Sequence, residues 1–252
     1  MIGVVTALSQ ESKALWQCCS LYRESRVGGF RLWEWKERGV VLESGMGREA
    51  AGEGATLLAR RYPLRCLYVV GFAGGVAPEL RTGDLVVGET VYCASLDPER
   101  VQAFRTDPGL EKGIREAGQR AGLRCQRGTL LTVDRVITDQ DEKGRLHQRH
   151  EVVAVDMESG AVAAVAHRQG IPFLAVRIIF DTWEMSLPPA LLALSDRRGE
   201  IRPGRVMHYL SRHPAHVPLF WRLLKRWYRA QQALAALGRA WWKAEMEEGE
   251  KT

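Results

Sequence analysis

Short runs rich in valine and isoleucine alternate along the chain with segments long enough to form helices. The runs predict strands over 2–7, 39–44, 66–71, 84–91, 129–137, 152–156 and 172–180. Between them, helices are predicted near 9–20, 48–61, 109–122 and 158–170. The strand runs are hydrophobic throughout, as expected of strands that helices cover on both faces. The pattern therefore predicts an α/β fold of three layers, with a central mixed twisted sheet flanked by helices.

The character of the sequence changes near residue 186. Segment 187–203 is rich in proline, glycine and charged residues, which predicts a linker loop. Beyond it, residues 204–252 are predicted to form a helical C-terminal extension with helices near 204–212 and 217–243. We therefore expect one α/β domain over residues 1–186 that carries a helical appendage.

Composition narrows the class of protein. With 252 residues, of which 46% are hydrophobic, the chain can bury one sizeable core. No apolar run approaches the roughly 20 residues that span a bilayer, and the first residues lack the features of a signal peptide, so we expect a cytoplasmic protein. The five cysteines form no CxxC pair and the histidines show no metal-binding spacing. We expect neither a metal nor a cofactor.

Three carboxylates directly follow predicted strands. Glu11 comes just after the first strand, Glu158 just after VVAVD, and Asp181 ends the strand AVRIIFD. Ligands of open α/β sheets bind beyond the carboxyl ends of the strands, so these positions are candidates for a functional site. Each also has a structural explanation, because acidic residues stabilise the first turn of a helix and aspartate often caps the segment after a strand.

Two glycine-rich turns strengthen the functional interpretation. SGMG (44–47) and GFAGG (71–75) each follow a predicted strand. Such turns let backbone amides approach an anion or a sugar closely. Neither has the spacing of GxGxxG or GxxxxGK[ST], which disfavours a nicotinamide enzyme and a P-loop ATPase.

Taken in order, five segments resemble the purine nucleoside phosphorylase and methylthioadenosine/S-adenosylhomocysteine nucleosidase superfamily, whose phosphorylase/hydrolase-like fold is then implied over about residues 1–185. They are ALSQES around Glu11, SGMGREAA (44–51), GFAGGVAPELRTGDLVV (71–87), VDMES (155–159) and VRIIFD (176–181). Farther along, LPPALLAL (187–194) and YLSRHPAHVPLFWRLLKR (209–226) resemble the tail of the hopanoid-associated phosphorylases. Resemblance to that subfamily implies release of adenine from adenosylhopane during hopanoid side-chain synthesis.

The resemblance implies a role for each matching residue. Asp181 would deliver a proton to N7 of the purine, Glu158 would hold the ribose 2'-hydroxyl, and Glu11 would orient the attacking water. The implied substrate-binding residues are Met157, Val136, Ile137, Phe180, Gly74 and Ala73. The implied nucleophile or phosphate site consists of Gly45, Gly47, Arg48 and Arg177. The chemistry requires such groups, because a purine leaving group must be protonated and a cationic sugar must be stabilised.

Two residues depart from the superfamily pattern. Phe180 stands where a serine usually precedes the catalytic aspartate, which affects base recognition. Phe72 replaces a small polar residue in the glycine turn, which affects the nucleophile site. The nucleophile itself stays open: the charge of Glu11 favours water, whereas Arg48 and Arg177 could support phosphate as a co-substrate.

Segment 214–243 combines an apolar stripe with a cationic face. The stripe consists of Val217, Phe220, Trp221, Leu224, Trp227 and Tyr228, and the cations are Arg222, Lys225, Arg226 and Arg229. This composition is typical of a helix in a membrane interface. It is also typical of a stripe that packs on the core or on a second subunit, with solvated cations. The net charge of +6 agrees with an anionic partner.

The leading hypothesis is an enzyme that cleaves the N-glycosidic bond of a 5'-substituted purine nucleoside, by phosphorolysis or hydrolysis, with adenosylhopane as the leading substrate. A methylthioadenosine/S-adenosylhomocysteine nucleosidase is the alternative within enzymes, and a catalytically inactive nucleoside-binding protein is the alternative outside them. The resemblance implies a homo-oligomer, and a peripheral contact with the inner face of the membrane is one reading of 214–243. No nucleic-acid partner is expected, because such sites spread cations among few large apolar neighbours.

Overall fold

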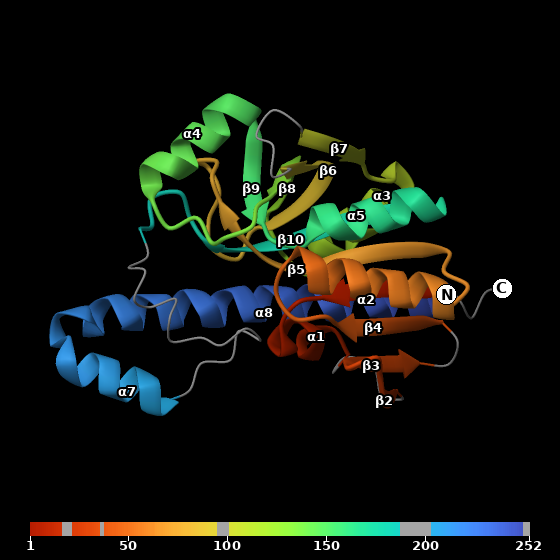
Figure 1. Ribbon diagram of the computed structural model, residues 1–252, viewed down its shortest axis with the longest axis horizontal. Helices are drawn as coiled ribbons and strands as arrows, with labels where there is room; N and C mark the ends of the chain where they lie inside the picture. The colour runs from red at the N-terminus through yellow and green to blue at the C-terminus, as the bar shows by residue number, and fades with distance from the viewer. Residues whose placement is uncertain (17–21, 36–37, 95–100, 187–202, 249–252) are drawn as a thin grey trace.

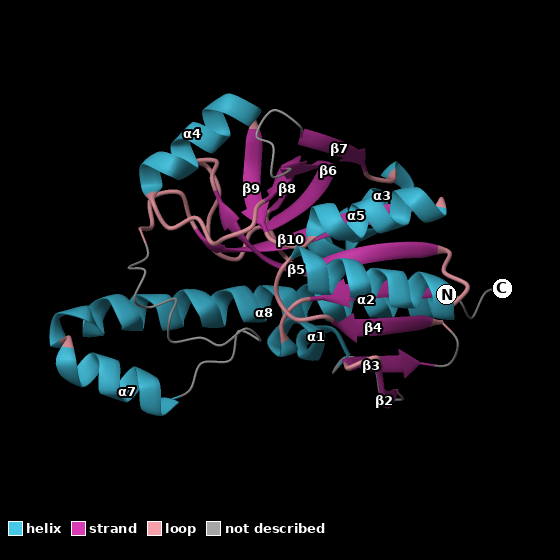
Figure 2. Cartoon of the chain, in the orientation of Figure 1, coloured by secondary structure: helices cyan, strands magenta, loops and turns pink. Residues whose placement is uncertain are grey.

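The computed structural model describes residues 1–16, 22–35, 38–94, 101–186 and 203–248. Figure 1 shows an α/β body with one long helix running along it and a helical hairpin projecting at one end. The helices and strands are drawn by type in Figure 2. The predicted linker at 187–203 lies, except for its last residue, outside the described residues.

The described strands and helices have the following bounds. The strands are β1 (Ile2–Thr6), β2 (Arg23–Val27), β3 (Phe30–Trp35), β4 (Gly39–Glu43), β5 (Cys66–Gly75), β6 (Leu85–Ala94), β7 (Val101–Arg105), β8 (Cys125–Thr132), β9 (Val152–Asp156) and β10 (Phe173–Asp181). The helices are α1 (Ser9–Trp16), α2 (Arg48–Arg61), α3 (Pro108–Arg120), α4 (Gln140–His150), α5 (Ser159–Gln169), α7 (Pro203–Arg212), the short 3₁₀ helix η1 (Pro214–His216) and α8 (Val217–Glu248).

All ten described strands belong to one mixed sheet in the order β10-β6-β8-β9-β5-β1-β4-β3-β2, with β7 beside β6. Strand β5 is parallel to both β1 and β10, so the carboxyl ends of these three strands meet at one edge. Strand β5 also pairs with β9, and β10 also pairs with β6. The strands β5, β9, β8, β6 and β10 therefore close on one another, which brings the residues after β9 towards those after β10.

Helices cover both faces of the sheet, which confirms the predicted three-layer α/β fold. Helices α2 and α5 pack on one face through buried alanine, valine and leucine side chains. Helices α1, α3 and α8 pack on the other face. Strand β5 contributes to both cores, with Leu67 and Val69 on one side and Tyr68 and Val70 on the other. This alternation is the expected consequence of a strand covered twice.

The second half of α8 belongs to the core of the α/β body. Four of its side chains are buried in the core between α8 and the sheet: Leu234, Leu237, Trp241 and Trp242. The rings of Trp242 and Trp35 pack edge-on, with centroids 4.2 Å apart. Gly238 lets α8 approach α1, because a Cβ atom there would lie 2.9 Å from the carbonyl oxygen of Ala14. Each large buried side chain stabilises the fold by about 1.5–3 kcal/mol. The predicted apolar stripe lies in the first half of the helix, where Trp227 packs against Phe72 and Phe180, whereas Trp221, Leu224 and Tyr228 are exposed.

Several element boundaries differ from those predicted. The strand predicted at 129–137 lies at Cys125–Thr132, so Val136 and Ile137 fall between β8 and α4. The hairpin of β2 and β3, strand β7 and helix α4 were not predicted. Strand β2 is an edge strand with mostly exposed side chains, and α4 is almost entirely polar. Neither needs the hydrophobic pattern on which the prediction depended.

Candidate active site

Glu11 draws the carboxyl ends of two parallel strands together. It lies in the first turn of α1 and is buried. Its Oε2 atom accepts hydrogen bonds from the backbone amides of Ala7 and Leu8, both at 2.9 Å. Its Oε1 atom accepts one from the amide of Phe72 at 2.7 Å. Burial raises the pKa of Glu11 above its ordinary value, whereas the charge of Arg177 and these amides lower it.

The segment 71–75, predicted as a glycine turn, is in the structure the carboxyl end of strand β5, so that prediction is wrong. The predicted residues meet over this end of the strand. A Cβ atom at Gly71 would lie 2.5 Å from Oε1 of Glu11 and 2.7 Å from Nη1 of Arg177. A Cβ atom at Gly74 would lie 3.1 Å from Oδ1 of Asp181. Only glycine leaves room for these polar groups to lie over the strand, so Glu11, Arg177 and Asp181 all lie against the last residues of β5.

Glu158 is the third predicted carboxylate, and it lies next to Arg177. It follows β9, and its Oε1 atom accepts a hydrogen bond from the amide of Gly47 at 2.9 Å. Gly47 has a φ of 98°, a conformation that favours glycine, and it immediately precedes α2. Oε2 of Glu158 lies 3.7 Å from Nη2 of Arg177. Burial raises the pKa of Glu158, the charge of Arg177 lowers it, and the neighbouring Asp156 raises it further.

Arg177 is a fully buried cation shared among carboxylates. Its Nε atom donates to Oδ2 of Asp156 at 2.9 Å, and its Nη2 atom donates to the hydroxyl of Ser159 at 2.9 Å. Asp156 and Glu158 both form ion pairs with it, and the charge of Glu11 also stabilises its protonated form. One guanidinium thus faces the carboxyl groups of Asp156, Glu158 and Glu11. These groups leave the cluster without a surplus of positive charge that could attract an anion.

Asp181 is buried at the end of β10 and pairs with a lysine that the sequence pattern did not single out. Burial raises the pKa of Asp181, and the adjacent ammonium of Lys143 is the largest effect that lowers it. Lys143 comes from α4 and donates a hydrogen bond to Oδ2 of Asp181. A single lysine in a polar helix gives no sequence signal for such a contact.

The residues predicted to bind an anion are engaged with protein acceptors. The amide of Gly45 donates to the carbonyl oxygen of Ala7 at 3.0 Å, and that of Gly47 donates to Glu158. Arg48 pairs with Asp134 at 2.8 Å, and it also donates to the carbonyl oxygen of Thr132. Arg177 is held by the carboxylates described above.

The predicted substrate-binding residues come from four parts of the chain. Ala73 and Gly74 are among the last residues of β5, Met157 lies directly before Glu158, and Phe180 lies directly before Asp181. Ile137 is buried in a small cluster with Val155, the neighbour of Gly74 across the sheet, whereas Val136 is exposed. This arrangement is compatible with a base held between the end of β5 and the segment after β8.

The two residues that depart from the superfamily pattern share one partner. Trp227 of α8 lies 4.9 Å from the ring of Phe72 and 5.7 Å from the ring of Phe180. Next to it, Arg226 contacts the hydroxyl of Thr182, which follows Asp181. Helix α8 therefore packs against Phe72, whose backbone amide binds Glu11, and against the end of β10. The expectation that Arg226 belongs to a solvated cationic face is wrong, because the side chain turns towards the protein.

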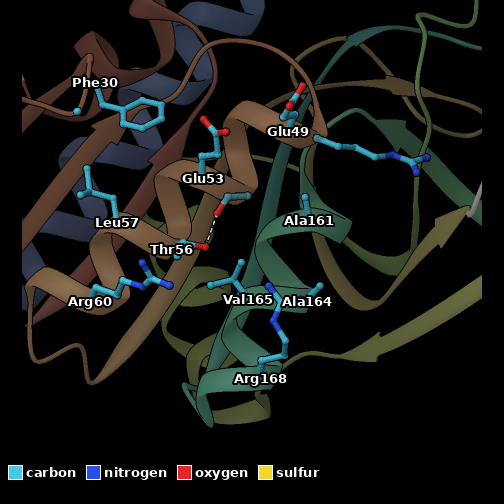
Figure 3. A pocket seen from close by; sticks show the side chains of 13 residues that line it. Phe30, Glu49, Glu53, Thr56, Leu57, Arg60, Ala161, Ala164, Val165 and Arg168 are labelled. Carbon is cyan, nitrogen blue, oxygen red and sulfur yellow. Dashed lines mark hydrogen bonds between the residues drawn. The ribbon is translucent and has the colours of Figure 1, made fainter.

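A surface hollow of about 570 Å³ lies elsewhere, between α2 and α5 (Figure 3). Glu53 and Leu57 of α2 line one wall, and Ala161 and Val165 of α5 line the other. None of the three carboxylates lines it. Within the described ranges, no group of three or more histidine, cysteine or acidic side chains is placed to hold a metal ion.

The comparisons with known proteins agree with this geometry. Residues 1–188 match the family model described as the phosphorylase superfamily. The chain belongs to this superfamily. The match confirms the predicted superfamily and the predicted class of enzyme, the purine nucleoside phosphorylases and nucleosidases.

Curated relatives within the superfamily are nucleosidases. The 5'-methylthioadenosine/S-adenosylhomocysteine nucleosidase of Haemophilus influenzae strain 86-028NP is 30% identical over 195 residues, which are 71% of this chain and 85% of that protein. The enzyme of the same name from Actinobacillus succinogenes is 31% identical over the same shares of the two chains.

Solved structures show the same fold. One is the methylthioadenosine/S-adenosylhomocysteine nucleosidase of Neisseria meningitidis in complex with methylthio-immucillin-A. It gives a TM-score of 0.70 at 20% identity, and the match covers 94% of this chain and 98% of that chain. The native futalosine hydrolase of Helicobacter pylori gives a TM-score of 0.65 at 20% identity over 71% of this chain and 87% of that chain.

Proposed function

We propose that this protein hydrolyses the N-glycosidic bond of a 5'-substituted purine nucleoside, with water and not phosphate as the nucleophile. The observation that carries the proposal is the occupation of every predicted anion-binding group by the protein itself. Three backbone amides bind Glu11, and the amide that precedes α2 binds Glu158. A carboxylate thus stands where a helix N-terminus would otherwise attract phosphate.

Electrostatics makes phosphate a poor occupant of this cluster. A negative charge placed about 4 Å from one carboxylate would be repelled by roughly 4 kcal/mol at an effective dielectric constant of about 20. Arg177 cannot compensate, because Asp156 and Glu158 already pair with it. A neutral water molecule does not meet this repulsion, and a carboxylate such as Glu11 can orient it and accept its proton.

The proposed reaction distributes three tasks over the three carboxyl groups. Asp181 gives its proton to N7, so that the glycosidic electron pair leaves with a neutral purine. Glu158 holds the 2'-hydroxyl and stabilises the positive charge that develops on the sugar. Glu11 takes a proton from the water that attacks C1'. The products are the free base and the unphosphorylated sugar.

Purified protein and 5'-methylthioadenosine provide the test of this proposal, with adenine release followed with and without phosphate. We expect release at the same rate in both mixtures. Release that requires phosphate would contradict hydrolysis. No release from methylthioadenosine, S-adenosylhomocysteine or adenosylhopane would favour a nucleoside-binding protein that lacks catalysis.

For the 5' substituent we propose a lipid, with adenosylhopane as the leading candidate. The resemblance of 187–194 and 209–226 to the hopanoid-associated phosphorylases supports this substrate, and so does the surface of the α7–α8 hairpin. Large apolar side chains are exposed there, with exposed fractions of 70% for Met207, 61% for Trp221 and 62% for Tyr228. The names of the curated relatives support the alternative, a small 5'-thio nucleoside.

The same hairpin supports a peripheral contact with an anionic membrane. Arg222, Lys225 and Arg229 are exposed beside Trp221 and Tyr228 on the first half of α8, and the hairpin projects from the body (Figure 1). Aromatic and cationic side chains together favour the interface of an anionic bilayer. No described helix is both long and apolar enough to cross a membrane.

A charge-reversal experiment tests the membrane contact. Replacing Arg222 and Lys225 with glutamate should abolish sedimentation with vesicles of anionic phospholipid and slow turnover of vesicle-embedded adenosylhopane, while turnover of methylthioadenosine is unchanged. The matched control reverses Arg23 and Arg26 on the exposed edge strand β2. Equal vesicle binding by both variants would refute this role. The homo-oligomer and the inner face of the membrane as location remain predictions.

A further inference from the structure

Lys143 is a fully buried cation in an otherwise exposed or half-buried helix. It is the buried residue of α4, whose residues are all described. Its ammonium donates to Oδ2 of Asp181, to the carbonyl oxygen of Thr182 at 3.0 Å and to that of Met185 at 3.1 Å. All three N–H donors are thus used. Removing an ammonium from water costs several kcal/mol, so a leucine would attach α4 to the sheet at a lower cost.

The contact with Lys143 distinguishes the two oxygens of Asp181. Oδ2 is held by the ammonium, whereas Oδ1 makes no contact with Lys143 and lies slightly nearer to the end of β5, at 3.1 Å from the position of a Cβ atom at Gly74 against 3.4 Å for Oδ2. The proposed purine site adjoins this end of β5. A proton on Asp181 therefore belongs on Oδ1, because Oδ2 already accepts a hydrogen bond from a cation.

We propose that Lys143 is a positioning residue for the cleavage, which directs the acidic proton of Asp181 to Oδ1 and stabilises the carboxylate left behind. In this step the O–H bond of Asp181 breaks and an N–H bond forms at N7. The electron pair of the O–H bond stays on the carboxylate, next to the ammonium of Lys143. The inference rests on the proposed glycosidic cleavage and adds a residue to it.

Charges from two elements face Asp181. Lys143 comes from α4, and Arg226 comes from α8 and also lowers the pKa of Asp181. Burial opposes both cations and raises this pKa. Burial alone would keep the proton on Asp181 but make it hard to release. Lys143, which contacts the carboxylate directly, makes release easier as the purine departs.

The test compares K143M with K143R across a range of pH, using adenine release from the nucleoside that the wild type accepts. We expect K143M to lose about 100-fold in kcat, within the range of a general acid, with KM changed less than about threefold. The basic limb of its profile should move to higher pH, because the pKa of Asp181 rises when the ammonium is removed. K143R keeps the charge, so its basic limb should stay at the wild-type position. R145M, which removes an exposed cation from the same helix, is the matched control.

A leaving group that needs no proton gives a second readout. With a p-nitrophenyl riboside as substrate, the defect of K143M should largely disappear, because p-nitrophenolate leaves without protonation. If K143M does not fold, K143R decides the question: a lower kcat with an unmoved basic limb supports the proposal, and a change in KM alone overturns it.

Folded K143M with the kcat and basic limb of the wild type would also overturn the inference, provided that the wild type releases adenine. If the wild type releases none, the proposed function fails first and this inference fails with it.

Discussion

Replacing Arg177 with methionine should destabilise the protein strongly at alkaline pH and much less at acidic pH. The substitution keeps the apolar stem but removes a guanidinium that lies 2.9 Å from Oδ2 of Asp156 and 3.7 Å from Oε2 of Glu158. Both pairs are almost completely shielded from solvent. Breaking a buried pair leaves an uncompensated charge, which costs about 3–5 kcal/mol.

The pH dependence follows from the sign of the pKa shifts. Burial raises the pKa of Glu11 and of Glu158, and the charge of Arg177 lowers both. Without Arg177 the folded-state pKa values rise further above those of the unfolded chain. A group with a raised folded-state pKa stabilises the fold below the unfolded pKa and loses that contribution as pH rises through the folded one. The deficit of R177M should therefore be largest near pH 8 and should shrink towards pH 5.

Urea unfolding at pH 8 and at pH 5.5 measures the loss in the free energy of unfolding of R177M. Equal denaturant slopes for the variant and the wild type would show that the surface exposed on unfolding is unchanged. R120M, which removes an exposed arginine at the end of α3, is the control and should change the free energy of unfolding by less than about 0.5 kcal/mol. A deficit of R177M that is absent, or equal at the two pH values, would refute the argument that Arg177 serves to hold the carboxylates.

Three further predictions concern single residues. Asp181→Asn should reduce kcat for adenine release by about 10²–10⁴-fold, and full activity in a saturation assay would show that Asp181 is not the acid. Because burial raises the pKa of Glu11 above 4.5 and the base must be ionised, kcat/KM should fall as pH decreases, with an acidic limb above pH 4.5. A limb below that value in the pH profile would exclude Glu11 as the base. Trp242→Ala should lower the free energy of unfolding by about 3–5 kcal/mol if α8 belongs to the core, and an unchanged urea midpoint would show that it does not.

The layered fold could be predicted because each buried strand carries its own hydrophobic run. Glu11 and Asp181 could be predicted for a related reason, because the parallel strands β1, β5 and β10 bring the residues after them to one edge. Glu158 follows β9, which is antiparallel to β5, so its place near them depends on the closure of the strands. Strand β2 and helix α4 could not be predicted, since exposed elements need no such run. Lys143 could not be predicted either, because it lies in α4 and its proposed function depends on a contact with Asp181, a residue 38 positions farther along the chain.

The two glycine-rich segments that were predicted as turns show a different limit of sequence reasoning. Their spacing indicates amides that are free to approach a ligand, but it does not say which acceptor takes them. In the structure Glu11 and Glu158, both distant in sequence, bind these amides. The same limit applies to Phe72 and Phe180, which are unexpected for the superfamily until the ring of Trp227 is seen to pack against both.

The origin of the oxygen on C1' of the sugar product tests the central claim most directly. Turnover of methylthioadenosine in water enriched in oxygen-18, with phosphate present, should give an unphosphorylated sugar that carries one labelled oxygen at C1', at times too short for the anomeric hydroxyl of an unlabelled sugar standard to exchange with the labelled water. Mass spectrometry of promptly quenched samples would show it. A sugar 1-phosphate as the product would mean that the carboxylate cluster admits phosphate, and the assignment of water as the nucleophile would be wrong.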